Sequence, residues 1–192
     1  MTVRVGGILL ASGFGRRFGG NKLLAPVEGR PLARRAMEVL SAAGLDRVAV
    51  TSQYQAVLDF APSYGFLPLY NRDAGEGVSA GIRLGLAAMD GMDGVLFSVC
   101  DQPWLTAGSV RRLLDTFRAA PQSICALAWQ GRRGNPVVFP RALFPALAAL
   151  TGDTGGGAVL RQYPERLRLV EAGSPQELRD IDTQADLWND PP

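Results

Sequence analysis

Hydrophobic and polar positions alternate along the chain between short apolar runs and longer stretches with helical spacing. The continuous apolar runs, which are typical of strands buried on both faces of a sheet, lie at residues 3–10, 47–51, 66–70 and 94–99. Apolar side chains recur at helical spacing over residues 32–43 and 78–89, which predicts two amphipathic helices. This regular alternation predicts an α/β protein, a three-layer sandwich around a mainly parallel sheet.

The second half of the chain continues the pattern with shorter elements. A helix that is capped by Thr106 or Ser109 is predicted after the strand at 94–99, and a last helix is predicted from Thr183. Further strands are predicted at residues 123–128, 136–139 and 168–170. Residues 54–64 fit neither period. Because no repeat or low-complexity linker interrupts the chain, we expect residues 1–192 to form a single domain.

The composition excludes several classes of enzyme, because the 192 residues include no histidine. Ser-His-Asp hydrolases, Cys-His proteases, HExxH zinc sites and facial-triad iron sites all require that residue. The two cysteines form neither a disulfide framework nor a metal-binding spacing. Chemistry in this chain must therefore depend on carboxylates, cations, backbone amides and a bound metal.

The overall charge is nearly balanced, whereas its distribution is not. A formal net charge of +2 argues against a dedicated binder of nucleic acid or of a membrane surface. The start of the chain lacks the features of a signal peptide, and no apolar stretch approaches the ~20 residues of a membrane span, so we expect a cytoplasmic protein. Residues 1–35 nevertheless carry seven Lys and Arg against one Glu, and Lys22 is the only lysine of the chain.

The loop after the first strand, residues 10–22, is rich in glycine and in cations. Glycines allow backbone amides to approach a polyphosphate closely, and Arg17 and Lys22 are placed to neutralise its charge. A dinucleotide fingerprint would require a glycine where Phe18 stands and an acid at the end of the second strand. A nicotinamide-dependent oxidoreductase is therefore disfavoured, and tight binding of NAD(P) would restore that alternative. A Walker loop is excluded because Gly-Lys-Ser/Thr is missing.

The same loop resembles the nucleotide-triphosphate signature of nucleotidyltransferases, L-A-A-G-x-[SG]-x-R-M-G-x-x-K. The positions in register are Leu10, Ala11, Gly13, Arg17, Gly19 and Lys22. Later segments resemble the molybdopterin cytidylyltransferases within that family, over most of the chain. These segments are residues 71–86 with Gly77, Ser79 and Arg83, the turn Cys100-Asp101-Gln102-Pro103, and residues 134–139, 150–153 and 180–187.

The resemblance implies a Rossmann-like fold of the nucleotide-diphospho-sugar transferase type and an enzyme that joins CTP to the phosphate of molybdopterin. It implies Mg²⁺ or Mn²⁺ as cofactor, and a molybdoenzyme or its maturation factor as a further partner. Catalytic roles are expected for Arg17, Lys22 and Asp101. Nucleotide-binding roles are expected for these residues and for Leu10, Ala11, Ser12, Gly13, Gly15, Ser79 and Arg83. Contacts with molybdopterin are expected from Asn135, Asp153 and Asp180.

Two carboxylates are the candidate metal ligands. Asp101 follows the carboxyl end of the clearest strand, where a parallel sheet opens onto its site, although it could instead cap the next turn. Asp182 is the candidate second ligand, although Asp182-Thr183 also fits the N-cap of the last helix. Two carboxylates together with phosphate oxygens and waters would suit octahedral Mg²⁺.

Four positions depart from the family pattern and leave alternatives open. Ser12 and Gly15 replace the usual Ala and Ser, Ala80 replaces the second of two serines, and Asn135 stands where histidine is common. Guanylyl relatives usually carry L-A-G-G in the loop, so the side chains of Ala11 and Ser12 are expected to narrow the floor beneath the base and to favour a pyrimidine. The alternatives are guanylyl transfer to molybdopterin, nucleotidyl transfer to a sugar or polyol phosphate, and a non-catalytic protein that binds the nucleotide or the finished cofactor.

Overall fold

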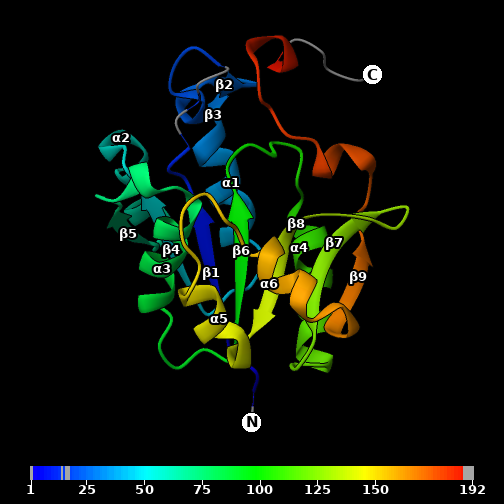
Figure 1. The fold of residues 1–192 in the computed structure, drawn as a ribbon. Coiled ribbons are helices and arrows are strands. Elements are labelled where there is room, and N and C mark those ends of the chain that lie inside the picture. The colour runs from blue at the N-terminus through cyan, green and yellow to red at the C-terminus, as the bar shows by residue number, and fades with distance from the viewer. Residues whose placement is uncertain (1, 14, 16–17, 188–192) are drawn as a thin grey trace.

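The computed structural model describes residues 2–13, 15 and 18–187 of the chain. Its centre is a seven-stranded sheet with the strand order β5-β4-β1-β6-β8-β7-β9 (Figure 1). The first four strands in this order are parallel and comprise Leu67–Tyr70, Arg47–Ser52, Val5–Leu10 and Gly94–Val99. The apolar runs β1, β4 and β6 thus form the buried middle of the sheet, as their composition predicts.

The other three strands complete the sheet, and one of them, β8, runs opposite to the rest. Strand β8 (Arg132–Pro140) pairs antiparallel with β6 on one side and with β7 (Ile124–Trp129) on the other. Strand β9 (Leu167–Glu171) runs parallel to β7 at the edge. The predicted α/β class with a mainly parallel sheet is confirmed.

Helices cover both faces of the sheet, and alternate strand residues face the two layers. Leu9 belongs to the core beneath α1 (Leu32–Ser41), α2 (Gln55–Leu58) and α4 (Ala107–Ala119), whereas the adjacent Ile8 belongs to the core on the opposite face. That second core contains residues of α3 (Val78–Ala87), α5 (Phe144–Ala148) and α6 (Gly157–Gln162). Because a strand has a period of two, the continuous apolar runs supply both cores.

One glycine sets the distance between α3 and the sheet. A Cβ atom at Gly85 would lie 2.6 Å from Cγ2 of Ile8 in β1, so a larger residue would push the helix away. The N-terminal end of α3 is thereby held over the carboxyl ends of β1 and β4, where ligands bind in parallel sheets. This packing places Val78 and Gly81 of α3 in the wall of a pocket.

The remaining elements are short. Residues 54–64, which fitted neither period, form α2 and a 3₁₀ turn, and β2 (Pro26–Val27) pairs antiparallel with β3 (Arg30–Pro31). The helix predicted from Thr183 is wrong within the described residues, because Gln184–Leu187 is a 3₁₀ turn. The other 3₁₀ turns are Lys22–Leu24, Ala61–Tyr64, Ala74–Glu76, Arg141–Leu143, Pro164–Arg166 and Pro175–Leu178.

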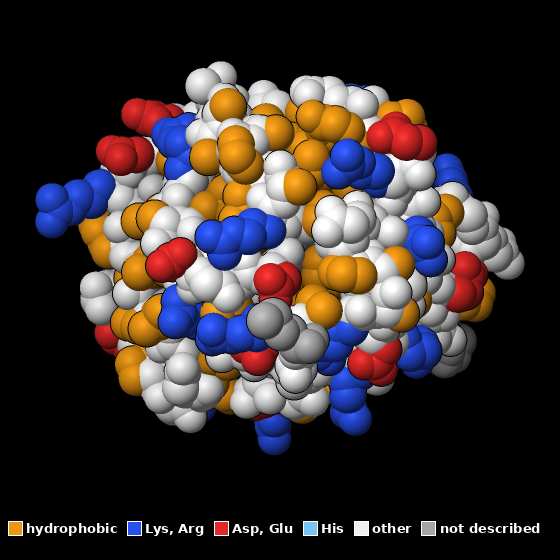
Figure 2. Space-filling model, turned by 90° about the horizontal axis from the view of Figure 1, so that it is seen from below, with side chains coloured by type: hydrophobic (Ala, Val, Ile, Leu, Met, Phe, Trp, Pro, Cys, Tyr) orange, Lys and Arg blue, Asp and Glu red, His pale blue; other side chains and the backbone are white. Residues whose placement is uncertain are grey.

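The two ends of the sheet differ in character. Figure 2 shows the end opposite the pocket, where blue and red charged side chains are interspersed with hydrophobic ones. Over the described part of the chain, no helix is both long enough and apolar enough to cross a membrane.

Candidate active site

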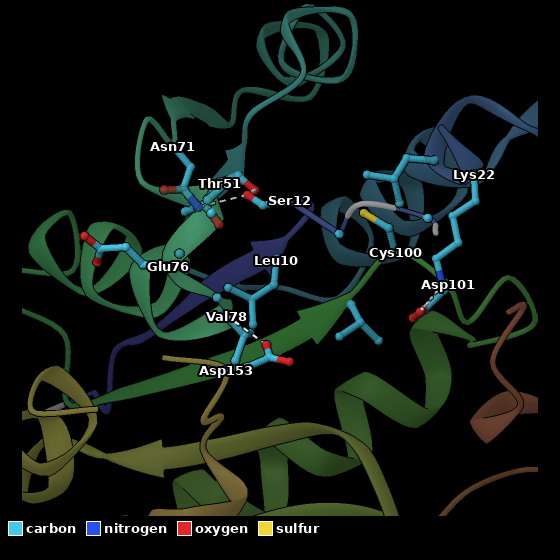
Figure 3. A pocket seen from close by; sticks show the side chains of 18 residues that line it. Leu10, Ser12, Lys22, Thr51, Asn71, Glu76, Val78, Cys100, Asp101 and Asp153 are labelled. Atoms are coloured by element: carbon cyan, nitrogen blue, oxygen red, sulfur yellow. Dashed lines mark hydrogen bonds and ion pairs between the residues drawn. The ribbon is translucent and has the colours of Figure 1, made fainter. Parts of the chain in front are cut away.

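A pocket of about 550 Å³ lies at the carboxyl ends of β1, β4 and β6 (Figure 3). Its wall is built from the loop after β1, the turn that carries Lys22, the ends of β4 and β6, the segment from Asn71 to Gly81, and Asp153. These segments are far apart in the sequence. The pocket therefore lies where a doubly wound sheet is expected to bind its ligand.

The glycine-rich loop contributes backbone to one side of the pocket. Leu10, Ser12, Gly13 and Gly15 all line it. Gly15 has a φ of +58°, and a Cβ atom at this position would collide with the carbonyl oxygen of Gly20. Only glycine fits this turn without strain, which supports the prediction of a loop shaped for close approach of a ligand. Arg17, the other cation predicted for this loop, lies outside the described residues.

Lys22 and Asp101 form an ion pair inside the pocket. The Lys22 Nζ atom donates to Oδ2 of Asp101 at 2.8 Å (Figure 3). It also donates to the carbonyl oxygen of Ile181 at 2.9 Å and lies 3.5 Å from Oδ1 of Asp182. Burial by itself would lower the pKa of the Lys22 ammonium, but the hydrogen bond and charge of Asp101, helped by Asp182, outweigh it and raise that pKa. The ammonium is therefore charged at neutral pH.

The C-terminal segment that brings Ile181 and Asp182 to Lys22 is held by a buried carboxylate. Glu177 is 3% exposed, and its carboxylate accepts from the backbone N–H and the hydroxyl of Thr106 at 3.2 and 3.0 Å and from the N–H of Gly173 at 2.8 Å. The N–H of Ile181 donates to the carbonyl of Asp101 at 2.8 Å. Sequence reasoning missed Glu177, because no local pattern indicates a carboxylate that caps a helix 70 residues away.

The residues around Lys22 fit a divalent cation only in part. Asp101, Asp182 and the Ile181 carbonyl offer hard oxygen donors, which is the chemistry that Mg²⁺ and Mn²⁺ prefer. Among the described residues, no group of three or more His, Cys, Asp or Glu side chains could hold a metal ion by itself. A cation here would thus need phosphate oxygens or waters as further ligands, as Mg²⁺ in nucleotide sites usually has.

The opposite end of the pocket is polar, and its wall includes a threonine with a buried hydroxyl. The Asn71 amide donates to the Ser12 hydroxyl at 3.1 Å, and that hydroxyl lies 3.3 Å from the Thr51 carbonyl. The Thr51 Oγ1 atom is completely buried and has no hydrogen-bond partner among the described residues. A buried hydroxyl without a partner costs stability, and Thr51 is one of the residues of the pocket wall.

Thr51 and Asn71 were not singled out as ligand-binding residues from the sequence. A signal for Thr51 was present, because it is a polar residue at the carboxyl end of a buried strand beside the glycine-rich loop. Asn71 follows β5 and is held by the bond from its N–H to the Ser52 carbonyl at 2.8 Å. Both residues are therefore fixed by the sheet, which suits groups that orient a ligand.

The structure corrects the expected position of Ala11. Its side chain is completely buried in the core between the sheet and α1, so it does not form a floor beneath a base. The reason is that the ladder continues past β1, where the Ala11 N–H donates to the Thr51 carbonyl at 2.9 Å. Ala11 therefore points to the same side as Leu9, and Ser12 points into the pocket.

Ser79 and Arg83 lie beside the pocket and bind each other. The Arg83 guanidinium donates to the Ser79 hydroxyl at 3.2 Å and to the Leu150 carbonyl at 2.8 Å, and pairs with Glu76 at 2.7 Å. These bonds connect α3 to the segment that contains Glu76 and to the loop that begins at Leu150 and contains Asp153. Direct contact of either residue with a nucleotide stays a prediction.

The three residues predicted to contact molybdopterin lie in different places. Asp153 lines the pocket and accepts from the N–H of Val78 at the start of α3, at 3.3 Å. Asp180 accepts from the Gln102 amide at 2.9 Å, and partial burial together with the charge of Asp101 raises the pKa of its carboxyl. Asn135 lies in β8, outside the lining of the pocket.

Comparison with known proteins gives one family match. Residues 7–167 match the model of the MobA-like NTP transferase domain. Among similar chains, nicotine blue oxidoreductase of Paenarthrobacter nicotinovorans is 32% identical and aligns over 96% of this chain and 95% of its own length. Purine catabolism protein PucB of Bacillus subtilis is 30% identical over 92% and 91%. Molybdenum cofactor guanylyltransferase of Rhodobacter capsulatus is 33% identical over 82% and 83%.

Solved structures agree with this match. The crystal structure of Rv0371c from Mycobacterium tuberculosis aligns over 96% of both chains with a TM-score of 0.81 and 26% identity. A manganese complex of Rv0371c aligns over the same share of both chains with a TM-score of 0.76 and 25% identity.

Proposed function

The chain belongs to the family of MobA-like NTP transferase domains, and we propose that it joins CTP to the phosphate of molybdopterin and releases pyrophosphate. We take residues 1–192 as one NTP-transferase domain. The observation that carries the proposal is the meeting of Lys22 and Asp101 beside the glycine-rich loop, in a pocket of about 550 Å³. A cation, a carboxylate and a turn that requires glycine are the parts that nucleotidyl transfer needs.

The proposed reaction needs no general base. An oxygen of the acceptor phosphate attacks the α-phosphorus of CTP, the bond from that phosphorus to the oxygen bridging to the β-phosphate breaks, and pyrophosphate leaves. A phosphomonoester has a second pKa of about 6, so the attacking oxygen is mostly ionised at neutral pH. The lack of histidine is therefore compatible with this chemistry.

The chain's own residues bind and orient the phosphates. Backbone amides of the loop around Gly13 and Gly15 approach them, and the Lys22 ammonium offsets the charge that develops on the leaving pyrophosphate. Asp101 and Asp182 would hold a divalent cation together with phosphate oxygens. When bound, Mg²⁺ or Mn²⁺ supplies charge neutralisation and a template that orients donor and leaving group.

Support for CTP comes from the polar end of the pocket. Ser12 presents a hydroxyl to the pocket, where the L-A-G-G loop of guanylyl relatives has only glycine. Thr51 adds a buried hydroxyl to the same wall, and no hydrogen-bond partner for it occurs among the described residues. A polar site rejects a ligand that leaves its buried groups unpaired more strongly than shape alone does. Because Ala11 lies in the core, Ser12 alone carries the steric part of this preference.

A pyrophosphate-release assay tests the proposal. Purified protein is incubated with CTP or GTP, with and without molybdopterin and Mg²⁺. We expect release that depends on CTP, molybdopterin and the metal together. Release with GTP in place of CTP would show a guanylyltransferase, and release with a sugar or polyol phosphate as acceptor would identify a different substrate. A protein that binds CTP or molybdopterin but releases nothing would be a carrier.

A second candidate function is favoured by one comparison. The similarity to nicotine blue oxidoreductase extends over 95% of that protein's length, which favours an oxidoreductase. The nicotinamide-dependent oxidoreductase considered from the sequence is the form of this alternative that can be tested. The loop departs from the dinucleotide fingerprint at Phe18, and β4 ends in Thr51-Ser52 without an acid for a ribose. Fluorescence titration with NADH and NADPH decides between the two, because the transferase should bind CTP far more tightly than either dinucleotide.

A further inference from the structure

The position of Lys22 has a consequence for metal binding. Its Nζ atom lies 2.8 Å from Asp101 Oδ2, 2.9 Å from the Ile181 carbonyl and 3.5 Å from Asp182 Oδ1. The Lys22 side chain is only 11% exposed, so it is packed into this position rather than extended into water. The ammonium therefore occupies the point on which the oxygen donors of the candidate metal site converge.

Two cations cannot share this position. A divalent ion bound to the Asp101 carboxylate would lie about 2.1 Å from its oxygen, within the space that the ammonium now fills. Like charges this close repel strongly in a partly buried site, where screening by water is weak. Asp101 is 23% exposed on its side chain, so it lies within this weakly screened region.

We propose that Lys22 is an internal counter-ion that occupies the cation position while no nucleotide is bound, and that it leaves the two carboxylates when a divalent cation takes its place. This inference rests on the proposed function in one respect only. The anion to which Lys22 then binds is taken to be a phosphate of the nucleotide. The Lys22 ammonium would thus exchange its carboxylate partners for a phosphate. The nucleotide-free protein would bind divalent cations weakly, because the ammonium competes with them.

The sequence of the chain supports the choice of lysine for this role. Lys22 is the only lysine beside nineteen arginines. A compact ammonium on a flexible stem can exchange one oxygen partner for another, whereas a planar guanidinium tends to hold a carboxylate through two bonds. The turn that carries Lys22 is fixed by the Asn21 side chain, which accepts from the N–H of Leu23 at 3.1 Å. The side chain can therefore move while its backbone stays in place.

The first test measures metal binding to nucleotide-free protein. Free Mn²⁺ is followed by electron paramagnetic resonance during titration of wild type, Lys22→Met, Asp101→Asn and the double variant. We expect Lys22→Met to bind Mn²⁺ on the order of tenfold more tightly than wild type, because the competing charge is gone. The double variant should lose that gain. Equal or weaker binding by Lys22→Met would overturn the proposal.

A matched control removes a cation elsewhere. Arg30 pairs with Glu38 through two bonds of 2.8 Å on an exposed surface, so Arg30→Met changes the net charge by the same amount away from the pocket. Its Mn²⁺ affinity should equal that of wild type. A gain as large as that of Lys22→Met would mean that net charge alone sets the affinity, which would also overturn the proposal.

The second test needs no variant. Because the chain has one lysine, protein labelled with ¹⁵N-lysine gives a single side-chain amine resonance. Titration with Mg²⁺ alone should shift this resonance and speed its proton exchange, with the same midpoint as metal binding measured by calorimetry. Binding of Mg²⁺ that leaves the resonance unchanged would overturn the counter-ion role. Neither test involves nucleotidyl transfer, so failure of the transfer assay would leave both results standing.

Discussion

A Cβ atom at Gly81 would lie 3.1 Å from the hydroxyl oxygen of Thr51, so the absence of a side chain in α3 gives that buried hydroxyl its space behind the pocket wall. The same Cβ would lie 3.3 Å from Cδ2 of Leu10. Helix α3 and strands β1 and β4 thus pack closely at this point of the pocket wall. This contact suggests a substitution that would affect the ligand more than the fold.

Gly81→Ala should weaken nucleotide binding without unfolding the protein. The added methyl group crowds Thr51 and Leu10, while alanine within a helix is more favourable than glycine by about 0.5–1 kcal/mol. We expect KM for the nucleotide to rise by on the order of tenfold, with kcat changed less and stability within about 1 kcal/mol of wild type. Steady-state kinetics and thermal unfolding check this. An unchanged KM would place the nucleotide away from Thr51.

Ser12→Gly should relax the preference for CTP over GTP. Removing the hydroxymethyl group opens space at the polar end of the pocket and removes the acceptor of the Asn71 amide bond. The measurement is the ratio of kcat/KM for the two nucleotides. Ala11→Gly is the matched control, because Ala11 lies in the core and its loss should lower stability without changing the ratio. A wild-type preference for GTP would show that this loop does not select a pyrimidine.

Lys22→Ala should slow turnover by on the order of 10²-fold, because a preorganised cation on a transferring phosphoryl group contributes several kcal/mol. Lys22→Arg should also be impaired, since a planar fork fits poorly between the Asp101 carboxylate and the Ile181 carbonyl. Rapid-quench measurement of a single turnover separates this effect from product release. The same defect is expected for Arg17→Ala. Wild-type rates in both Lys22 variants would show that Lys22 has no role in catalysis.

Asp101→Asn should abolish metal-dependent activity while the nucleotide still binds through the loop amides. Asparagine keeps an oxygen donor but loses the charge that would hold Mg²⁺. Asp182→Asn should have the smaller effect, because the Asp182 side chain is 53% exposed and lies farther from the shared cation position than Asp101 does. Activity measured over a range of Mg²⁺ concentrations distinguishes the two. Full activity of Asp101→Asn at all concentrations would argue against a metal role.

Stability should fall in alkaline solution through a buried thiol. Burial raises the pKa of Cys125 to about 11 in the folded protein, whereas an unfolded cysteine ionises near its ordinary value of about 8.5. Above that value the unfolded chain loses its proton first, so the free energy of unfolding decreases as the pH rises toward 11. Cys125→Ala should show less of this decrease in urea titrations at pH 8 and pH 10. An equal decrease of the free energy of unfolding with pH in both proteins would contradict this prediction.

Several features could be predicted from the sequence because they depend on local patterns. The apolar runs fixed β1, β4 and β6 as buried strands, and the helical spacing of apolar residues located α1 and α3. The place of Asp101 in the pocket wall could be predicted because it follows β6, and parallel sheets bind ligands at the carboxyl ends of their strands. The bond between Ser79 and Arg83 is an i, i+4 pair, which their spacing in a helix already allows.

The direction of the Ala11 side chain depends on whether the strand geometry of β1 continues for one more residue. Residues 5, 7, 9 and 11 share one face if the strand geometry continues, and the bond from the Ala11 N–H to the Thr51 carbonyl shows that it does. The sequence contains no mark of where a strand geometry ends, because that depends on the neighbouring strand. Ala11 therefore lies in the core and Ser12 in the pocket.

The sequence by itself determined the layers of this protein and the two ends of its glycine-rich loop, because hydrophobic period and glycine geometry are local properties. Only the tertiary structure decided which distant groups meet. The carbonyl of Ile181 lies against Lys22, Glu177 caps the helix that begins after Thr106, and the Thr51 hydroxyl lies beneath Gly81. Such contacts depend on how elements pack across the sheet, and a one-dimensional pattern does not encode the distance between residues 159 positions apart.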